Sequence, residues 1–114
     1  MSSEEEYLSS YNIEDYDRPS VTTDIVAFAI RSEQEDTYRH NPKNVLSLLL
    51  IKRGEHPFIN CWALPGGFLR SDESIEECAF RKVTEETNVT PTALMLFDQF
   101  SEPNRDPRGR IISN

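Results

Sequence analysis

Apolar residues occur along this chain in short runs that polar, proline-containing segments separate. Residues 21–31 (VTTDIVAFAIR) and 45–52 (VLSLLLIK) are rich in β-branched and aliphatic residues, so each run predicts a buried strand. A third run, residues 94–101 (LMLFDQFS), also predicts a strand. The segment 32–44 is polar and contains a proline, which predicts an exposed loop. The apolar pattern therefore predicts a small sheet.

A helical period replaces the strand pattern after residue 70. Its apolar residues recur at three- and four-residue steps and form one core-facing stripe: Ile75, Cys78, Ala79 and Val83. Ser71 or Asp72 is expected to cap the helix N-terminus. Asn88 stands just past the last turn, where asparagine tolerates the left-handed conformation that ends many helices. This is the best-defined helix that the sequence predicts.

The helix follows a sharp turn at Pro65, Gly66 and Gly67, where glycine allows the backbone to approach a ligand or an ion closely. At the other end of the chain, residues 3–17 have helical tendency and an apolar stripe of tyrosines. We expect this segment to pack on the domain and to end at Pro19. The predicted division is a lead-in segment at residues 1–20 and one domain at residues 21–114.

Composition narrows the function. A chain of 114 residues supports one modest core, and no apolar run approaches a membrane span. The net charge of −8 argues against nucleic-acid binding by this segment, because phosphate contact needs a basic face. The same negative charge could serve to bind divalent cations or could simply keep the protein soluble. The acidic N-terminus is not a signal peptide, so a cytoplasmic location is expected. Cys61 and Cys78 are expected to be buried free thiols.

Charged residues around the predicted helix keep a fixed spacing. Five residues separate Gly67 from Glu73, seven separate Glu73 from Arg81, and then follow Val83, Glu85, Glu86 and Val89. This pattern resembles the Nudix box of Nudix hydrolases, G-x5-E-x7-R-E-U-x-E-E-x-G-U, in which U is aliphatic. Two positions differ, because Lys82 replaces the glutamate after the arginine and Asn88 replaces the glycine.

The resemblance implies a fold and a reaction. The fold is an α/β Nudix-type α/β/α sandwich with a mixed sheet against which the box helix packs. The reaction is attack of water on the diphosphate of a nucleoside diphosphate derivative, with Mg²⁺ (or Mn²⁺) that neutralises the phosphates and positions the water. Magnesium prefers oxygen ligands, and a few carboxylates suffice because it keeps several waters.

The resemblance also assigns residues. Glu85 and Glu86 are implied as the catalytic and metal-binding carboxylates, and a backbone carbonyl of Gly66 or Gly67 as a further metal ligand. Three residues are implied to be mainly structural and to hold the loop and the helix together: Gly67, Glu73 and Arg81.

Lys82 adds a cation at a position where the box has an anion. At three- and four-residue spacing it is expected to pair with Glu85 and Glu86. Repulsion between Lys82 and a divalent ion is expected to weaken at least one metal site, although Glu85 and Glu86 could still hold one magnesium ion. Two functions therefore remain open: hydrolysis of an ADP-ribose-like compound, or sensing of such a metabolite by a catalytically weak domain.

A basic loop follows the third predicted strand. Arg105, Arg108 and Arg110 lie in the segment RDPRGR, which resembles Nudix proteins that handle ADP-ribose and the Nudix domain of NrtR-type transcriptional regulators of NAD metabolism. The resemblance implies that these arginines bind the diphosphate, since guanidinium groups make bidentate contacts. The alternative is a solvated basic turn. Asp24 likewise either contacts a ligand or points outward from its strand.

The chain stops at Asn114 within a predicted strand. A Nudix domain is expected to continue with further strands and a second long helix, so the sequence predicts that these C-terminal elements are missing. The sheet would then have an exposed edge, and an exposed edge favours pairing with a second chain. We therefore expect a homodimer whose ligand is a nucleotide-type small molecule, with no membrane partner.

Overall fold

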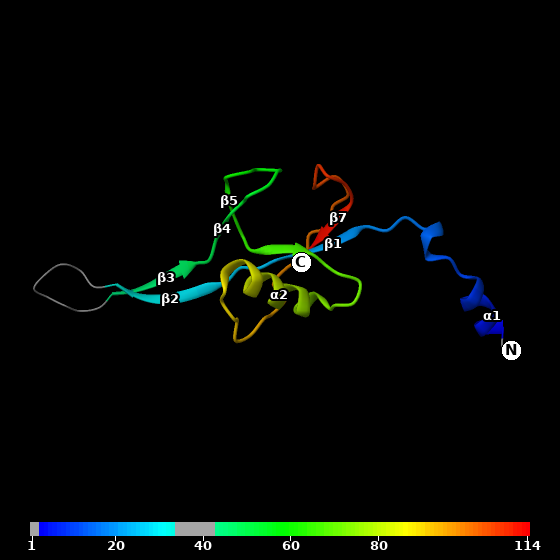
Figure 1. The fold of residues 1–114 in the computed structure, drawn as a ribbon, viewed down its shortest axis with the longest axis horizontal. Helices are drawn as coiled ribbons and strands as arrows, with labels where there is room; N and C mark the ends of the chain where they lie inside the picture. Colours follow the sequence, from blue (N-terminus) through cyan, green and yellow to red (C-terminus); the bar gives the residue numbers. More distant parts are fainter. Residues whose placement is uncertain (1–2, 34–42) are drawn as a thin grey trace, which may run out of the picture.

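The computed structural model describes residues 3–33 and 43–114 (Figure 1). Most of the predicted exposed loop at residues 32–44 lies outside the described residues. The elements follow one another in this order: α1 (Ser3–Ser10), the 3-10 helix η1 (Ile13–Asp15), β1 (Ser20–Asp24), β2 (Phe28–Glu33), β3 (Lys43–Leu48), β4 (Ile51–Lys52), β5 (Trp62–Ala63), β6 (Gly66–Phe68), α2 (Ile75–Thr87) and β7 (Ile111–Ser113).

The central sheet has three strands in the order β6-β1-β7. β1 pairs antiparallel with β6, with Thr23 opposite Gly67, and parallel with β7, with Val21 opposite Ile112. The predicted mixed sheet is therefore confirmed. The two central threonines are buried, and the hydroxyls of Thr22 and Ser113 lie 2.8 Å apart. The pairing brings the two ends of the predicted domain together.

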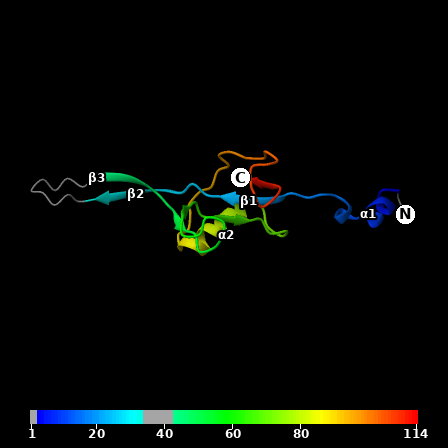
Figure 2. The same ribbon diagram turned by 90° about the horizontal axis from the view of Figure 1, so that it is seen from above.

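Helix α2 packs against β1 and β6 (Figure 2). Of its predicted apolar stripe, Cys78 and Val83 are fully buried, whereas Ile75 near the helix start is 37% exposed. Asn88 ends the helix in the left-handed conformation with φ 58°, as predicted. The expected N-cap was wrong, because Ser74 rather than Ser71 or Asp72 accepts a hydrogen bond from the Glu77 amide, at 3.1 Å.

Each of the two long predicted strands is broken. The run 21–31 divides between β1 and β2, and the run 45–52 divides between β3 and β4. β2 and β3 form a hairpin that projects from the body of the molecule (Figures 1 and 2). Its outer face carries exposed apolar side chains: Phe28, Ile30, Leu46 and Leu48. The prediction that these runs are wholly buried was wrong, because pairing satisfies the backbone while no described layer covers that face.

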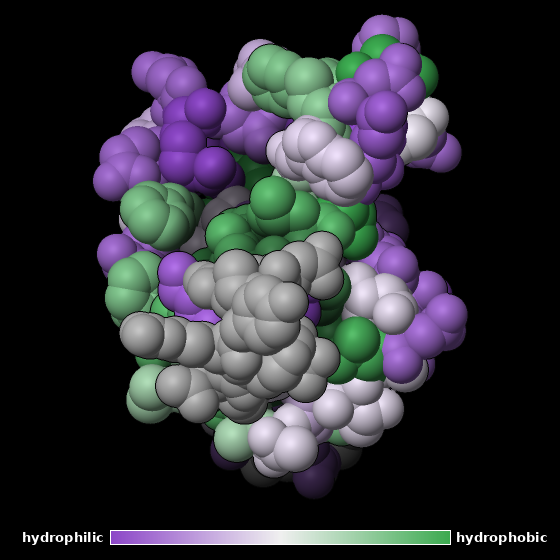
Figure 3. Space-filling view, turned by 90° about the vertical axis from the view of Figure 1, so that its left-hand side faces the viewer, coloured by the Kyte–Doolittle hydropathy of each residue, from purple (hydrophilic) through white to green (hydrophobic). Residues whose placement is uncertain are grey.

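Viewed from the hairpin end, hydrophobic surface is visible across the upper middle of the molecule and in smaller patches at its left edge, and hydrophilic residues lie at the upper left and at the right (Figure 3). In the described part of the chain, α2 is the one helix in contact with the sheet. The described residues therefore form an α/β fold in which one helix packs against a mixed sheet. None of the helices formed by residues 3–33 and 43–114 is long and apolar enough to cross a membrane.

Three further local predictions were wrong. The lead-in segment does not pack on the domain: its residues are exposed, and its tyrosines contact one another, with Tyr11 and Tyr16 stacked at 5.4 Å between ring centroids. The run 94–101 forms only an isolated bridge, between Phe100 and Ser113. Cys61 is exposed, whereas Cys78 is buried as expected, and both thiols are free. The apolar composition of these segments did not indicate whether the rest of the chain would cover them.

Candidate functional site

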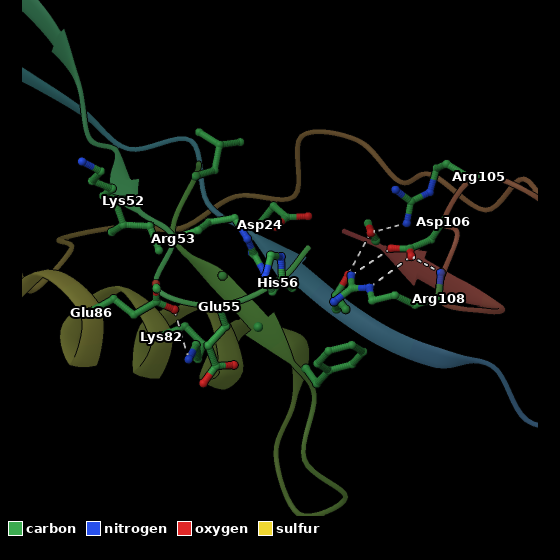
Figure 4. A pocket seen from close by; sticks show the side chains of 18 residues that line it. Asp24, Lys52, Arg53, Glu55, His56, Lys82, Glu86, Arg105, Asp106 and Arg108 are labelled. Carbon is green, nitrogen blue, oxygen red and sulfur yellow. Dashed lines mark hydrogen bonds and ion pairs between the residues drawn. The ribbon is translucent and has the colours of Figure 1, made fainter. Parts of the chain in front are cut away.

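A cavity of about 720 Å³ lies between the central sheet, helix α2, the connector after β4 and the loop before β7 (Figure 4). Its walls carry five basic side chains: Lys52, Arg53, Lys82, Arg105 and Arg108. Four acidic side chains accompany them: Asp24, Glu55, Glu86 and Asp106. A slight excess of positive charge in a chain of net charge −8 makes this cavity suitable for an anionic ligand.

Gly66 and Gly67 lie in β6 and form the floor of the cavity between β1 and α2. A Cβ atom at Gly66 would overlap the Thr23 carbonyl, so only glycine fits at this register position. A Cβ atom at Gly67 would lie 2.6 Å from the Cε atom of Lys82. The predicted turn was wrong at the two glycines, because both belong to strand β6. Their close backbone contacts are to β1 and to the Lys82 side chain, and approach to a ligand or an ion stays a prediction.

Arg81 and Glu73 join the helix to the loop that precedes it. Arg81 donates through Nη2 to Glu73 Oε1 at 2.6 Å and through Nε to Glu73 Oε2 at 2.9 Å. The Arg70 amide also donates to Glu73, at 2.9 Å. The hydrogen bonds from Arg81, and then the one from the Arg70 amide, lower the pKa of Glu73 to about 2. The hydrogen bond to Glu73 in turn raises the pKa of Arg81. This geometry supports the structural role predicted for the pair.

Of the two carboxylates predicted to be catalytic, only Glu86 faces the cavity. Glu86 lines the cavity, and its Oε1 lies 3.0 Å from the ammonium nitrogen of Lys82. Glu85 is 49% exposed; its Oε2 lies 3.4 Å from Arg81 and 3.9 Å from Lys82, and it does not line the cavity. The ion pairs expected for Lys82 are thus present, and each predicted metal ligand on the helix already faces a cation.

This arrangement does not fit a preformed divalent-cation site. Within residues 3–33 and 43–114, no group of three or more histidine, cysteine, aspartate or glutamate side chains is placed to hold an ion. The Gly67 carbonyl, one of the two predicted carbonyl ligands, faces the buried Cys78 thiol at 4.0 Å. Binding of Mg²⁺ or Mn²⁺ by Glu85 and Glu86 stays a prediction.

Two of the three arginines predicted to bind substrate reach the cavity. Arg105 donates to the Ser113 hydroxyl at 2.6 Å and to the Ile111 carbonyl at 3.3 Å, which ties the loop to β7. Arg108 pairs with Asp106 at 2.9 Å. Arg110 instead donates to the Ser101 carbonyl, at 2.5 Å, and lies outside the cavity lining.

Asp106 and Phe68 hold Arg108 in place. The hydrogen bond from Arg108 to Asp106 lowers the pKa of this carboxyl to about 2. The Arg108 guanidinium also lies 5.3 Å from the centre of the Phe68 ring, within the range of a cation–π contact. Arg108 is therefore orientated before any ligand arrives, and its outer edge remains available to an anion.

The segment 52–56 lines the cavity throughout, whereas the sequence predicted only a turn-bearing connector after the run 45–52 and a local hydrogen-bonding role for His56. The charged residues directly at the end of an apolar run were the available signal. Asp24, whose role was left open, also lies in the cavity, beside Arg53 and His56 (Figure 4). Its side chain is accessible, yet the cavity walls desolvate it and raise its pKa, despite the opposing charges of Arg105, Arg108 and Arg53.

Comparisons with known proteins identify the family of this chain. The NUDIX domain family model matches residues 18–113. An ADP-ribose pyrophosphatase of Methanocaldococcus jannaschii is 48% identical over 66 residues, which cover 58% of this chain and 39% of that protein. An ADPR responsive transcriptional repressor, NtrR, of Acinetobacter baylyi is 36% identical over 115 aligned positions, which cover 99% of this chain and 42% of the repressor.

The solved structures include the NUDIX domain of Shewanella oneidensis NrtR in complex with ADP ribose. It superimposes with a TM-score of 0.80 at 32% identity, over 99% of this chain and 67% of that domain. The chain spans about two fifths of the length of the two curated relatives. Because the family match covers nearly the whole sequence and the fold agrees, the chain belongs to the Nudix family.

Proposed function

We propose that this domain binds a nucleoside diphosphate derivative of the ADP-ribose type and acts as the ligand-sensing part of a transcriptional regulator of NAD metabolism. The observation that carries the proposal is the ion pair between Lys82 and Glu86, which lies in the cavity at 3.0 Å. Lys82 stands where the Nudix box has a glutamate, so a cation replaces a carboxylate. The site is therefore suited to binding an anion rather than to activating water.

The cavity supports a ligand of this class. Its volume of about 720 Å³ falls within the range usual for pockets that hold small molecules. Arg105 and Arg108 on one side and Lys82 on the other offer donors to a diphosphate. Asp24 offers an acceptor for a ribose hydroxyl. The similarity to the NrtR domain in complex with ADP ribose extends over 99% of the chain, so it includes all of these positions.

Similarity to a repressor over almost the whole chain supports the regulatory role. The repressor is more than twice as long as the matched region, because the match covers 42% of it. The net charge of −8 makes this domain a poor DNA-binding surface, so DNA contact is assigned to another part of such a regulator.

Hydrolysis of the diphosphate is the second candidate. Glu85 and Glu86 keep their places in the box, and the identity to the Methanocaldococcus jannaschii ADP-ribose pyrophosphatase reaches 48% over the matched region. In this case Arg105 and Arg108 would hold the diphosphate while water attacks one phosphorus and displaces the other phosphate, which breaks the P–O–P bridge and releases AMP. The engagement of Glu86 by Lys82 weighs against this function.

Turnover and binding measured together separate the two candidates. The native domain and the Lys82→Glu variant are incubated with ADP-ribose and Mg²⁺, AMP is quantified by chromatography, and binding is followed by calorimetry. We expect the native domain to bind ADP-ribose without forming AMP above background, and AMP to appear with the variant. Rapid AMP formation by the native domain would establish the hydrolase instead. Absence of binding by both proteins would refute both candidates.

A further inference from the structure

We infer that the ammonium group of Lys82 takes the place of a divalent cation beside the ligand, so that a nucleoside diphosphate binds without metal. This inference rests on the proposed function, since it concerns how the same cavity holds the same class of ligand. It departs from the magnesium-dependent binding that the resemblance to Nudix hydrolases implies. Three features of the described residues carry it.

The first feature is the placement of the lysine side chain. The aliphatic stem of Lys82 lies against Gly67 so closely that an added Cβ atom would come within 2.6 Å of Cε and 2.9 Å of Cδ. The side chain is only 23% exposed, although lysine is usually the most solvated of residues. Packing of the stem therefore directs the charged end into the cavity. Little conformational entropy remains to be lost when a ligand binds.

The second feature is the hydrogen-bonding capacity of the ammonium group. An ammonium has three N–H donors, and the ion pair with Glu86 at 3.0 Å occupies one direction. The Glu85 carboxylate lies further away, at 3.9 Å. The remaining donors can bind the oxygens of a diphosphate, and hydrogen bonds between charged groups are the stronger kind.

The third feature is the set of partners around the lysine. Glu86 is the carboxylate that a metal would need in the cavity, and Lys82 neutralises it. Arg105 and Arg108 approach the same cavity from the loop before β7, opposite the helix (Figure 4). A diphosphate between these walls would meet positive charge on both sides. A bound metal ion would instead face the repulsion of Lys82.

Calorimetric titration of the native domain with ADP-ribose, once in excess EDTA and once in Mg²⁺, tests the metal dependence. We expect the dissociation constants in the two buffers to agree within about twofold, because the ligand would meet the same fixed charges in both. Binding that occurs only in Mg²⁺ would overturn the inference and leave the proposed function intact. Absence of binding in both buffers would refute the proposed function itself.

Three variants titrated in EDTA test the role of Lys82. Lys82→Met keeps the stem and removes the charge, so we expect binding to weaken about 10- to 100-fold, the range for loss of a hydrogen bond to a charged group. Lys82→Arg keeps the charge and is expected to retain most of the affinity. Lys43→Met, the same chemical change on the exposed end of β3, is the matched control and should bind as the native domain does.

Circular dichroism establishes that each variant is folded. Native-like affinity of Lys82→Met in EDTA would overturn the inference. If Lys82→Met does not fold, Lys82→Gln is titrated in its place. Native-like affinity of Lys82→Gln, or an equal loss of affinity in Lys82→Gln and Lys82→Arg, would overturn the inference, whereas affinity retained by Lys82→Arg and lost by Lys82→Gln supports the role of the charge.

Discussion

Two neighbouring residues of α2 face different regions of the molecule and have different consequences. Arg81 turns toward the preceding loop and makes two hydrogen bonds with Glu73, at 2.6 and 2.9 Å. Lys82 turns into the cavity and pairs with Glu86 at 3.0 Å. The Arg81 region keeps the residues of the Nudix box, whereas the Lys82 region departs from them. The motif that builds the fold can therefore persist while the chemistry of its site changes.

The difference follows from the two side chains. A guanidinium is planar and matches a carboxylate through two parallel hydrogen bonds, so Arg81 fixes the angle between loop and helix. An ammonium is a compact charge on a flexible stem, and it can exchange one anionic partner for another. A fixed pair suits a structural region, and an exchangeable pair suits a ligand site.

Removal of the packing beneath both regions has the largest expected effect. Val83 is 1% exposed, and Val83→Ala should lower the free energy of unfolding by roughly 2–3 kcal/mol through lost burial and the cavity left behind. Urea denaturation measures the change, and Val26→Ala, at an exposed valine, serves as the control. A Val83→Ala domain as stable as the native one would show that α2 does not pack as described.

Arg81→Met is expected to destabilise the domain less than Val83→Ala does. The variant loses both hydrogen bonds to Glu73, whose side chain is 9% exposed, but removal of the guanidinium, itself 19% exposed, opens the carboxylate to water. The midpoint of urea denaturation should fall, while Arg18→Met on the exposed lead-in segment should leave it unchanged. If the midpoint is unaffected and ADP-ribose binding is lost instead, Arg81 would belong to the ligand site.

The same pair predicts a dependence of stability on pH. Because the folded-state pKa of Glu73 is lowered from 4.5 to about 2, its contribution is present above pH 4.5. It is lost as the pH falls from 4.5 through 2. Denaturation at several pH values, for the native domain and for Glu73→Gln, isolates this carboxyl from Asp106, whose pKa is lowered similarly. Equal acid sensitivity of the two proteins would contradict the assignment.

Two arginines of the loop before β7, Arg108 and Arg110, also differ in whether they face the cavity, and their replacement is expected to have a smaller effect. Arg108 lines the cavity and Arg110 does not. We expect Arg108→Gln to weaken ADP-ribose binding about tenfold and Arg110→Gln to change it less than twofold, as measured by calorimetry. Equal weakening by both variants would return Arg110 to the ligand site that the sequence predicted for it.

Sequence reasoning succeeded where local spacing determines structure. The three- and four-residue steps of the apolar stripe predicted α2 and its buried face, and Asn88 marked the helix end. The same spacing predicted that Lys82 would pair with Glu86. Regular steps along a helix place side chains on a known face, so contacts within α2 follow from the sequence alone.

Sequence reasoning failed where a contact depends on distant parts of the chain. Nothing within the apolar runs indicates that Phe28 and Leu46 face outward on a hairpin, because burial depends on what covers a strand rather than on its composition. Asp24 and Arg53 meet in one cavity only because β1 and the connector after β4 fold together. The homodimer and the cytoplasmic location that the sequence suggests also stay predictions.

The most direct test of the central claim is a crystal structure of the domain grown with ADP-ribose and Mn²⁺, with anomalous diffraction recorded to locate the metal. We expect the Lys82 ammonium group within hydrogen-bonding distance of a diphosphate oxygen and no Mn²⁺ beside Glu86. Anomalous density for Mn²⁺ between Glu86 and the diphosphate, with Lys82 turned away from the ligand, would contradict it.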